Sequence, residues 1–231
     1  MTEITEKQQF LDQLIAALVA DYQGRGGTIH CGRGCRNCCT LAVNCTWPEA
    51  ALLAGALTGE QLARIDCQVA QLRSIAATAA GLKDYLGRHR RETGGCPLLA
   101  DDGACGAYAS RPLSCRALLS TRESCWCGVD FAELPAAARE EYVASLDRSA
   151  VAFPLHYLAA PQEAGRELER QTLLAMAASV GFTLYGSMPV LVHLATRHDL
   201  AGAVAAGPAA VQELLARTEL ASPLLVQLET L

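Results

Sequence analysis

The first regular pattern in the chain is an amphipathic helix close to its start. Between Glu6 and Tyr22, apolar residues recur three and four positions apart, as they do on one face of a helix: Phe10, Leu11, Leu14, Ile15, Leu18 and Val19. Glycines at 24, 26 and 27 then interrupt the pattern, and glycine commonly ends helices. The sequence therefore predicts a helix that leads into a flexible loop.

Two further helices are predicted after the next, cysteine-rich stretch. Thr46 and Glu49 enclose Pro48 in the pattern of a capping box, with proline in the first helical turn. A second Thr-x-x-Gln pattern opens a longer helix over residues 58–78. Just before the first box, the apolar residues of the segment 41–46 alternate, which is typical of a short extended segment.

Helix signals dominate the last hundred residues. They are prolines at helix starts, a glycine at a helix end and further boundary residues, at Pro135, Pro161, Gly181, Asp199, Gly207-Pro208 and Ser222-Pro223. We predict a mainly α protein in which irregular cysteine-rich loops pack among helices. Residues 1–130 would form a cysteine-cluster domain with its N-terminal helix, and residues 131–231 a helical region packed on it.

One segment of this region is long and uncharged. Residues 171–196 contain no Asp, Glu, Lys or Arg, and about 20 apolar residues are enough to cross a bilayer. Glutamine, threonine, serine, glycine, proline and histidine residues interrupt the segment. Two buried helices joined near Gly186 are therefore favoured over a membrane span.

Composition and charge exclude some classes of function and favour others. The chain has 231 residues, of which 51% are hydrophobic, and a formal net charge of −5. That charge argues against binding of a nucleic-acid backbone, which needs a basic surface. Eleven cysteines are exceptional. The first residues do not read as a secretory signal, so we expect a cytoplasmic protein, in which dense cysteines bind metal or do redox chemistry.

The first cysteine motif is C-x3-C-x2-C-C, formed by Cys31, Cys35, Cys38 and Cys39. The first three thiols share one face of a helix, or can wrap one centre on a glycine loop. Either geometry suits a thiophilic ion or cluster. Because Cys38 and Cys39 are adjacent, only a turn lets both face one metal, and Cys39 could instead serve a second ion or an outer shell.

The second motif contains Cys96, Cys105 and Cys115. It reads CPLL, then CGAY, then RPLSCR, so that Tyr108, Arg111 and Arg116 accompany the thiols. Together the two motifs resemble the YkgJ-type cysteine cluster proteins, whose domain is described as zinc- or iron-chelating. The resemblance covers residues 31–116. It implies metal binding through the seven motif cysteines: Cys31, Cys35, Cys38, Cys39, Cys96, Cys105 and Cys115.

The nature of the metal stays open at this point. Zinc and iron–sulfur clusters both accept four thiolates, and seven thiols exceed one such site. We favour an iron–sulfur cluster, because C-x3-C-x2-C also holds the cluster of radical S-adenosylmethionine enzymes, although Asn37 replaces their usual aromatic residue. A similar domain occurs in flagellin lysine methylases, so methyl transfer from S-adenosylmethionine is conceivable, but no motif supports binding of that cofactor.

Other residues near the motifs have plain structural explanations. Cys45 and Cys67 are expected in the core, and His89 at a solvated helix end. His30 is expected to be exposed or to sit outside the ligand shell. Cys125 and Cys127 have no assigned role, although Trp126 between them could shield the metal. Arg111 and Arg116 either lower thiol pKa values or bind loop carbonyls, Asp101 or Asp102.

Two hypotheses for the function remain. One is a cluster-dependent redox or methyl-transfer protein, and the other is a structural zinc module for protein interaction or metal sensing. The catalytic residues, the substrate and any protein partner are left open, and neither a membrane nor a nucleic acid is expected as a partner.

Overall fold

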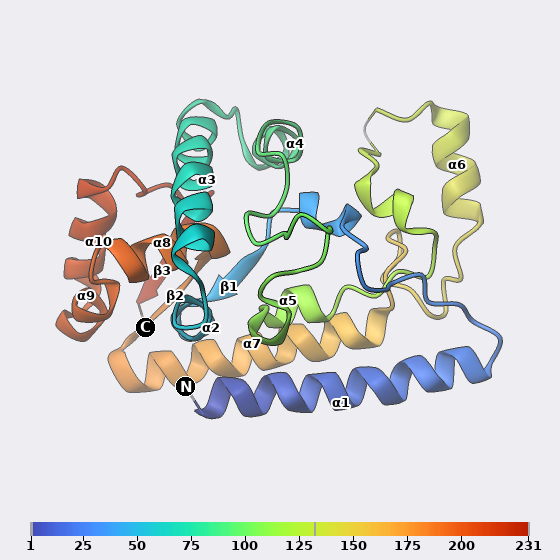
Figure 1. Cartoon of the computed structure of the whole chain (residues 1–231), viewed down its shortest axis with the longest axis horizontal. Coiled ribbons are helices and arrows are strands. Elements are labelled where there is room, and N and C mark those ends of the chain that lie inside the picture. Colours follow the sequence, from blue (N-terminus) through green and yellow to red (C-terminus); the bar gives the residue numbers. More distant parts are fainter. Residues whose placement is uncertain (1, 132, 231) are drawn as a thin grey trace.

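Helices make up most of the computed structural model, which describes residues 2–131 and 133–230 (Figure 1). The predicted mainly α fold class is therefore confirmed. The α-helices of the described chain are α1 (Thr2–Gly24), α2 (Trp47–Ala54), α3 (Gly59–Thr78), α4 (Leu82–Glu92), α5 (Leu113–Arg116), α6 (Ala136–Ala144), α7 (Ala159–Val180), α8 (Met188–Arg197), α9 (Leu200–Ala206) and α10 (Pro208–Arg217). The short 3₁₀ turns are η1 (Asn37–Thr40), η2 (Tyr108–Ser110) and η3 (Ser124–Gly128), and the strands are β1 (Asn44–Thr46), β2 (Phe182–Ser187) and β3 (Val226–Thr230).

The two longest helices, α1 and α7, lie side by side and run in opposite directions (Figure 1). Leu11 of α1 and Leu168 of α7 are buried together with Leu113 of α5. Burying apolar side chains in this way is the main force that holds helices together. The N-terminal helix and the C-terminal region therefore clamp the segment that carries Cys115.

A small antiparallel sheet joins the two ends of the chain, in the order β1-β2-β3. Gly186 of β2 pairs with Cys45 of β1 and with Val226 of β3. A Cβ at Gly186 would lie 2.4 Å from the carbonyl oxygen of Leu225, so only glycine fits there. This strand corrects the prediction of two helices joined near Gly186. Residues 182–185 alternate between buried and half-buried, as the period of a strand requires.

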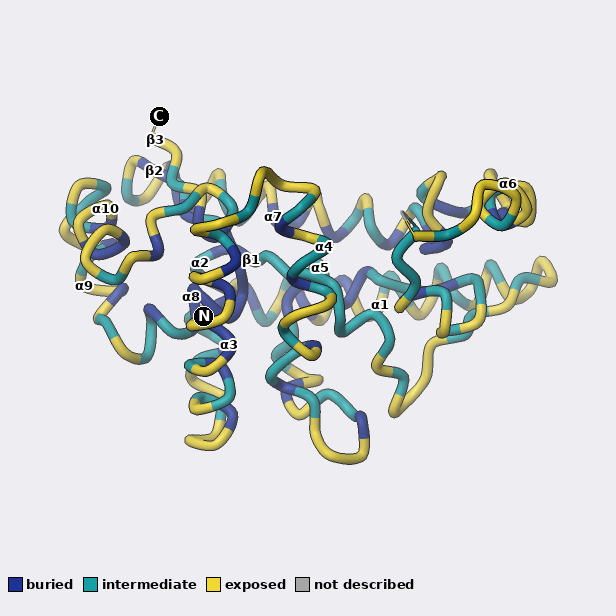
Figure 2. Tube along the Cα trace, turned by 90° about the horizontal axis from the view of Figure 1, so that it is seen from above, coloured by how far each residue is buried: buried dark blue, intermediate teal, exposed yellow. Residues whose placement is uncertain are grey.

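The largest hydrophobic core lies where α2, α3 and α8 pack around the sheet, and Figure 2 shows the buried parts of the chain gathered there. Leu53, Ile65 and Leu191 supply one buried side chain from each helix, and Phe182 supplies one from β2. Cys45 belongs to this core, as predicted.

The local helix signals are largely confirmed. Thr46 and Thr58 both form complete capping boxes. Gly181 ends α7 in the left-handed conformation, with φ +81°, and the side chain of Asp199 caps α9. Ser222 is the exception, because it begins no helix. Its carbonyl oxygen instead accepts hydrogen bonds from the N–H groups of the two residues that lead into β3.

The uncharged segment 171–196 folds as the end of α7, the strand β2 and the helix α8. Within the described chain, no helix has both the length and the apolar character needed to span a bilayer. The predicted division into residues 1–130 and 131–231 stays a prediction. The pairing of β1 with β2 and the packing of α1 on α7 connect the two parts.

Glu49 is a buried carboxylate that ties α2 to α5. One of its oxygens accepts hydrogen bonds from the backbone N–H of Thr46 at 2.9 Å and from the Thr46 hydroxyl at 2.7 Å. The other accepts the N–H of Leu113 at 2.8 Å. The side chain is 1% exposed, so both oxygens are needed to satisfy buried donors.

Glu49→Gln should therefore destabilise the fold. The amide nitrogen must face one of the buried N–H donors, and a buried donor left unpaired costs about 1–3 kcal/mol. Urea unfolding should show a loss of this size in the free energy of unfolding. Glu60→Gln, at an exposed position in the first turn of α3, should change it by less than about 0.5 kcal/mol. Equal effects of the two variants would contradict this role for Glu49.

Candidate metal centre

The first cysteine segment ends in a tight turn. Cys38 and Cys39 both lie in η1, where the N–H of Cys39 donates to the carbonyl of Arg36 at 3.0 Å. A hydrogen bond with the Cys39 thiol is the largest cause that raises the pKa of Cys38, followed by burial. The thiols of Cys38 and Cys39 therefore lie close together, as they must if both are to bind one metal site.

The second cysteine segment is held by α3. The side-chain amide of Gln68 donates to the carbonyl of Gly95 at 2.6 Å, just before Cys96. That of Gln61 donates to the carbonyl of Gly106 at 3.2 Å, just after Cys105. Two side chains about two turns apart on one helix thus fix both ends of the loop that presents Cys96 and Cys105.

The two cysteine segments touch at glycines. A Cβ at Gly103 would lie 3.3 Å from the carbonyl oxygen of Gly34, and one at Gly95 would lie 3.6 Å from that of Cys39. Gly103 and Gly95 also have positive φ angles, of +77° and +106°, which other residues rarely adopt. The backbone of each loop therefore reaches the other without intervening side chains.

Three thiols, those of Cys96, Cys38 and Cys105, gather around the half-buried Cys115. Burial is the first cause that raises the pKa of Cys115, and the charges of Cys96, Cys38 and Cys105 raise it further. Burial likewise raises the pKa of Cys96 to about 11, with the charges of Cys105 and Cys38 adding to it. The structure thus brings together thiols of both sequence motifs.

A second group of thiols, which includes Cys31, Cys35 and Cys127, also lies near Cys38. Burial is the first cause that raises the pKa of Cys31, and the charges of Cys35, Cys127 and Cys38 raise it further. The backbone N–H of Ser120, which lies 3.2 Å from the sulfur of Cys31, lowers this pKa. Burial also raises the pKa of Cys127, and the charges of Cys38 and Cys35 act in the same direction. Cys38 therefore faces both groups.

The sequence left two residues of this second group without a role. Cys127 is 4% exposed and His156 is 2% exposed, and they are in direct contact. Burial, followed by the charge of Arg122, lowers the pKa of His156 to about 4, so its ring is neutral near pH 7. A C-x-C spacing pointed toward Cys127 but did not assign it, and nothing around His156 in the sequence points to a site.

The two arginines beside Cys115 have different tasks. The charge of Arg111 lowers the pKa of both Cys38 and Cys115, and its guanidinium lies 4.0 Å above the ring of Tyr108. Arg116 is buried and donates to the carbonyl oxygens of Arg111 and Ala109. It also pairs with the carboxylate of Asp12 on α1.

The remaining predicted positions are placed as follows. Cys67 is exposed on α3, so its predicted core position was wrong: it lies on the solvent face of the helix. His89 is buried on α4 and not solvated, because its ring packs near that of Tyr85. Cys125 is exposed, whereas Trp126 packs on the rings of Phe131 and Tyr142.

The fit to a metal rests on the donor set. All eleven cysteines of the described chain are free thiols. Among the residues that the structure describes, no three Cys, His, Asp or Glu side chains already surround one ion position. The two groups near Cys38 nevertheless offer soft sulfur donors from separate segments, which is the ligand chemistry of zinc and of iron–sulfur clusters.

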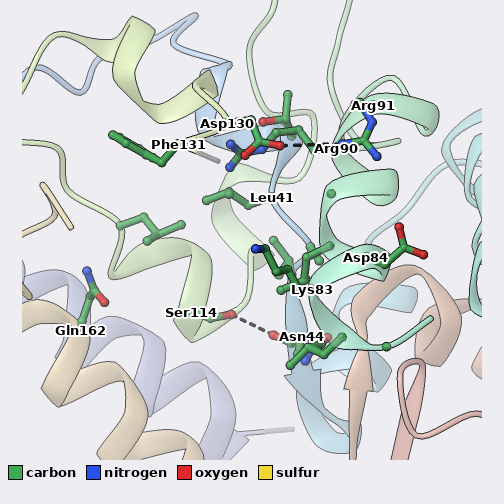
Figure 3. A pocket seen from close by; sticks show the side chains of 18 of the residues that line it. Leu41, Asn44, Lys83, Asp84, Arg90, Arg91, Ser114, Asp130, Phe131 and Gln162 are labelled. Carbon is green, nitrogen blue, oxygen red and sulfur yellow. Dashed lines mark hydrogen bonds and ion pairs between the residues drawn. The ribbon is translucent and has the colours of Figure 1, made fainter. Parts of the chain in front are cut away.

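A cavity of about 1130 Å³ runs beside the cysteine segments (Figure 3). Residues 40–44, which follow Cys39, and Ser114, which precedes Cys115, form part of its wall. None of the cysteines in the described chain lines it. Figure 3 shows Lys83, Arg90 and Arg91 on its α4 side.

Glu169 of α7 is the buried carboxyl group of this cavity. It is 8% exposed, and its Oε1 atom has no hydrogen-bond partner in the described chain. Burial is the first cause that raises its pKa, to about 8, and the charge of Glu49 adds to it. Hydrogen bonds with Ser114 and the charge of Arg166 act in the opposite direction. Glu169 is therefore mostly protonated at pH 7.

The raised pKa of Glu169 predicts a pH-dependent stability. Between the pKa of the unfolded chain, 4.5, and about 8, the folded protein binds one more proton than the unfolded chain, so the free energy of unfolding falls as the pH rises. The slope contributed by one group is at most about 1.4 kcal/mol per pH unit. Glu169→Gln should flatten this fall in urea titrations from pH 5 to 8, whereas Glu163→Gln, exposed on the same helix, should leave it unchanged. An unchanged slope in Glu169→Gln would refute the assignment.

Comparison with known families agrees with this geometry. Residues 30–131 match the family model described as "CxxCxxCC: Putative zinc- or iron-chelating domain". The matched segment contains all seven predicted ligands and also Cys125 and Cys127. No curated protein and no solved structure matches the chain. The resemblance drawn from the two cysteine motifs is confirmed, because residues 30–131 are similar to the CxxCxxCC zinc- or iron-chelating domain family.

Proposed function

We propose that this protein binds zinc or an iron–sulfur cluster through the thiolates of its two cysteine motifs: Cys31, Cys35, Cys38, Cys39, Cys96, Cys105 and Cys115. The observation that carries the proposal is the half-buried Cys115, which shares one environment with Cys96, Cys105 and Cys38. Thiols from segments so far apart in the chain have no need to converge for packing alone. The family match to residues 30–131 supports the same chemistry.

The number of donors argues for more than one metal ion. A single tetrahedral site takes four ligands, and seven thiolates exceed it. Because Cys38 faces both groups, a multinuclear centre or two neighbouring sites fit this arrangement. An iron–sulfur cluster is our first candidate, since C-x3-C-x2-C spacing also holds such clusters, and zinc is the alternative.

The chain's own residues prepare the sulfurs for a metal. The positive charge of Arg111 favours the thiolate form of Cys38 and of Cys115. The N–H of Ser120 points at the sulfur of Cys31, and hydrogen bonds to ligating sulfurs tune such centres. A bound cluster would supply electron transfer, whereas bound zinc would supply structural stability.

A redox or methyl-transfer activity is the second, more specific candidate, and the cavity beside the cysteine segments favours it. A pocket of about 1130 Å³ is large enough for a cofactor or a substrate. Binding of S-adenosylmethionine by the metal-loaded protein tests the methyl-transfer version. Saturable binding that Glu169→Gln or Leu41→Trp weakens would support it, and no binding would leave metal chelation as the function.

Metal content is the direct test of the main proposal. Protein purified without oxygen should contain stoichiometric iron with acid-labile sulfide and a brown colour, or stoichiometric zinc without colour. Cys38→Ser should bind less metal than the wild type, because Cys38 faces both groups of thiols. Cys67→Ser, which changes an exposed cysteine on α3, should retain it. Metal-free wild-type protein, or equal content in both variants, would contradict the proposal.

A further inference from the structure

Cys127 and His156 form a buried thiol–imidazole contact that packing does not require. The Sγ of Cys127 lies 3.3 Å from the Nε2 of His156. In a tetrahedral zinc site, bond lengths of about 2.3 Å to sulfur and about 2.1 Å to nitrogen place the two ligand atoms about 3.6 Å apart. The observed separation is therefore close to that of two ligands of one ion.

The imidazole of His156 is oriented as a ligand would be. Its Nδ1 is 2.6 Å from the hydroxyl of Tyr142, which fixes the ring and leaves Nε2 facing Cys127. Tyr142 itself packs on the rings of Trp126 and Phe131. Metal-bound histidines characteristically have their second ring nitrogen held in this way.

The backbone brings His156 to the first cysteine motif. The N–H and the hydroxyl of Thr121 both donate to the carbonyl of His156, at 2.9 Å each. The preceding residue, Ser120, pairs with Tyr157 in a β-bridge and donates its N–H to the sulfur of Cys31. The segment 119–121 therefore joins His156 on one side to Cys31 on the other.

Cys35 completes the group. Its N–H donates to the carbonyl of Gly32 at 3.1 Å, which folds the loop back toward Cys31. Two residues further on, the side-chain amide of Asn37 donates to the hydroxyl of Ser124 at 3.1 Å, which holds this segment against the turn that carries Cys127. Cys31 and Cys35 lie on an irregular loop that contains Gly32 and Gly34, and such a loop can close on an ion.

We propose that Cys31, Cys35, Cys127 and His156 form a distinct Cys3His site for a divalent ion of the zinc class. This inference rests on the proposed metal-binding function and extends it with a ligand from outside the matched segment 30–131. Cys38, Cys39, Cys96, Cys105 and Cys115 then remain for a separate thiolate centre. A nucleophilic Cys–His pair is a poor alternative, because Cys127 is 4% exposed and a reactive thiol needs access to its substrate.

The test uses Co²⁺ and Zn²⁺ with the full-length, metal-stripped protein. Wild-type protein should bind one more ion per chain than His156→Ala or Cys127→Ser, and its Co²⁺ absorption should include the bands of a site with three sulfurs and one nitrogen. His156→Cys should restore the lost ion with bands shifted toward those of a four-sulfur site. The control variants are His30→Ala, next to Cys31, and Cys125→Ser, two residues before Cys127. Both should bind as many ions as the wild type does.

X-ray absorption of the zinc-loaded wild type gives a result that needs no variant to fold. Nitrogen scattering at about 2.1 Å beside sulfur at about 2.3 Å is expected, and scattering from sulfur alone would overturn the Cys3His site. Unchanged Co²⁺ content in folded His156→Ala and Cys127→Ser would also overturn it, reducing the contact to a hydrogen bond. If the wild type binds no metal at all, the proposed function fails together with this inference.

Discussion

Thiols that are buried beside one another resist ionisation, and this constraint governs the whole centre. Each thiolate would lose hydration and face the charge of its neighbours, as the raised pKa values of Cys115 and Cys96 reflect. A thiophilic cation removes both penalties, because it replaces the proton and neutralises the group. Metal binding should therefore release protons and tighten as the pH rises.

The rest of the fold holds the cysteine segments in place, so their thiols stay close together. Gln61 and Gln68 of α3 hold the second cysteine loop, and the packing of α1, α5 and α7 holds the helix of Cys115. The loops cannot separate to relieve the crowding of their thiols without breaking buried hydrogen bonds. The packed helices therefore keep the thiols close together, and a metal ion needs this proximity to bind them. The family match ends at residue 131, yet His156 contacts Cys127 and α7 packs on α5, the helix of Cys115.

How far the sequence predicts this structure depends on how local each signal is. The capping boxes at Thr46 and Thr58 and the end of α7 at Gly181 depend on residues a few positions apart, and all were predicted. The sheet was missed at Gly186, because pairing of β1, β2 and β3 joins segments far apart in the chain. Cys67 and His89 were misplaced because composition alone does not say which face of a helix meets the core.

The same argument applies to the metal centre. The seven motif cysteines were predicted from their spacing and from the family they resemble, whereas His156 has no local pattern around it. Its relation to Cys127 depends on the bridge between Ser120 and Tyr157 and on the ring of Tyr142. Residues of this kind become visible only once the fold is known.

Mapping of cysteine accessibility in the metal-loaded protein tests the central claim most directly. Alkylation of the native chain, followed by mass spectrometry, should modify the exposed Cys67 and Cys125 rapidly. The seven motif cysteines and Cys127 should stay protected until a chelator removes the metal, and Cys31, exposed in the structure, is the decisive residue among them. Rapid modification of Cys31, Cys35 and Cys38 in the metal-loaded chain would contradict the account.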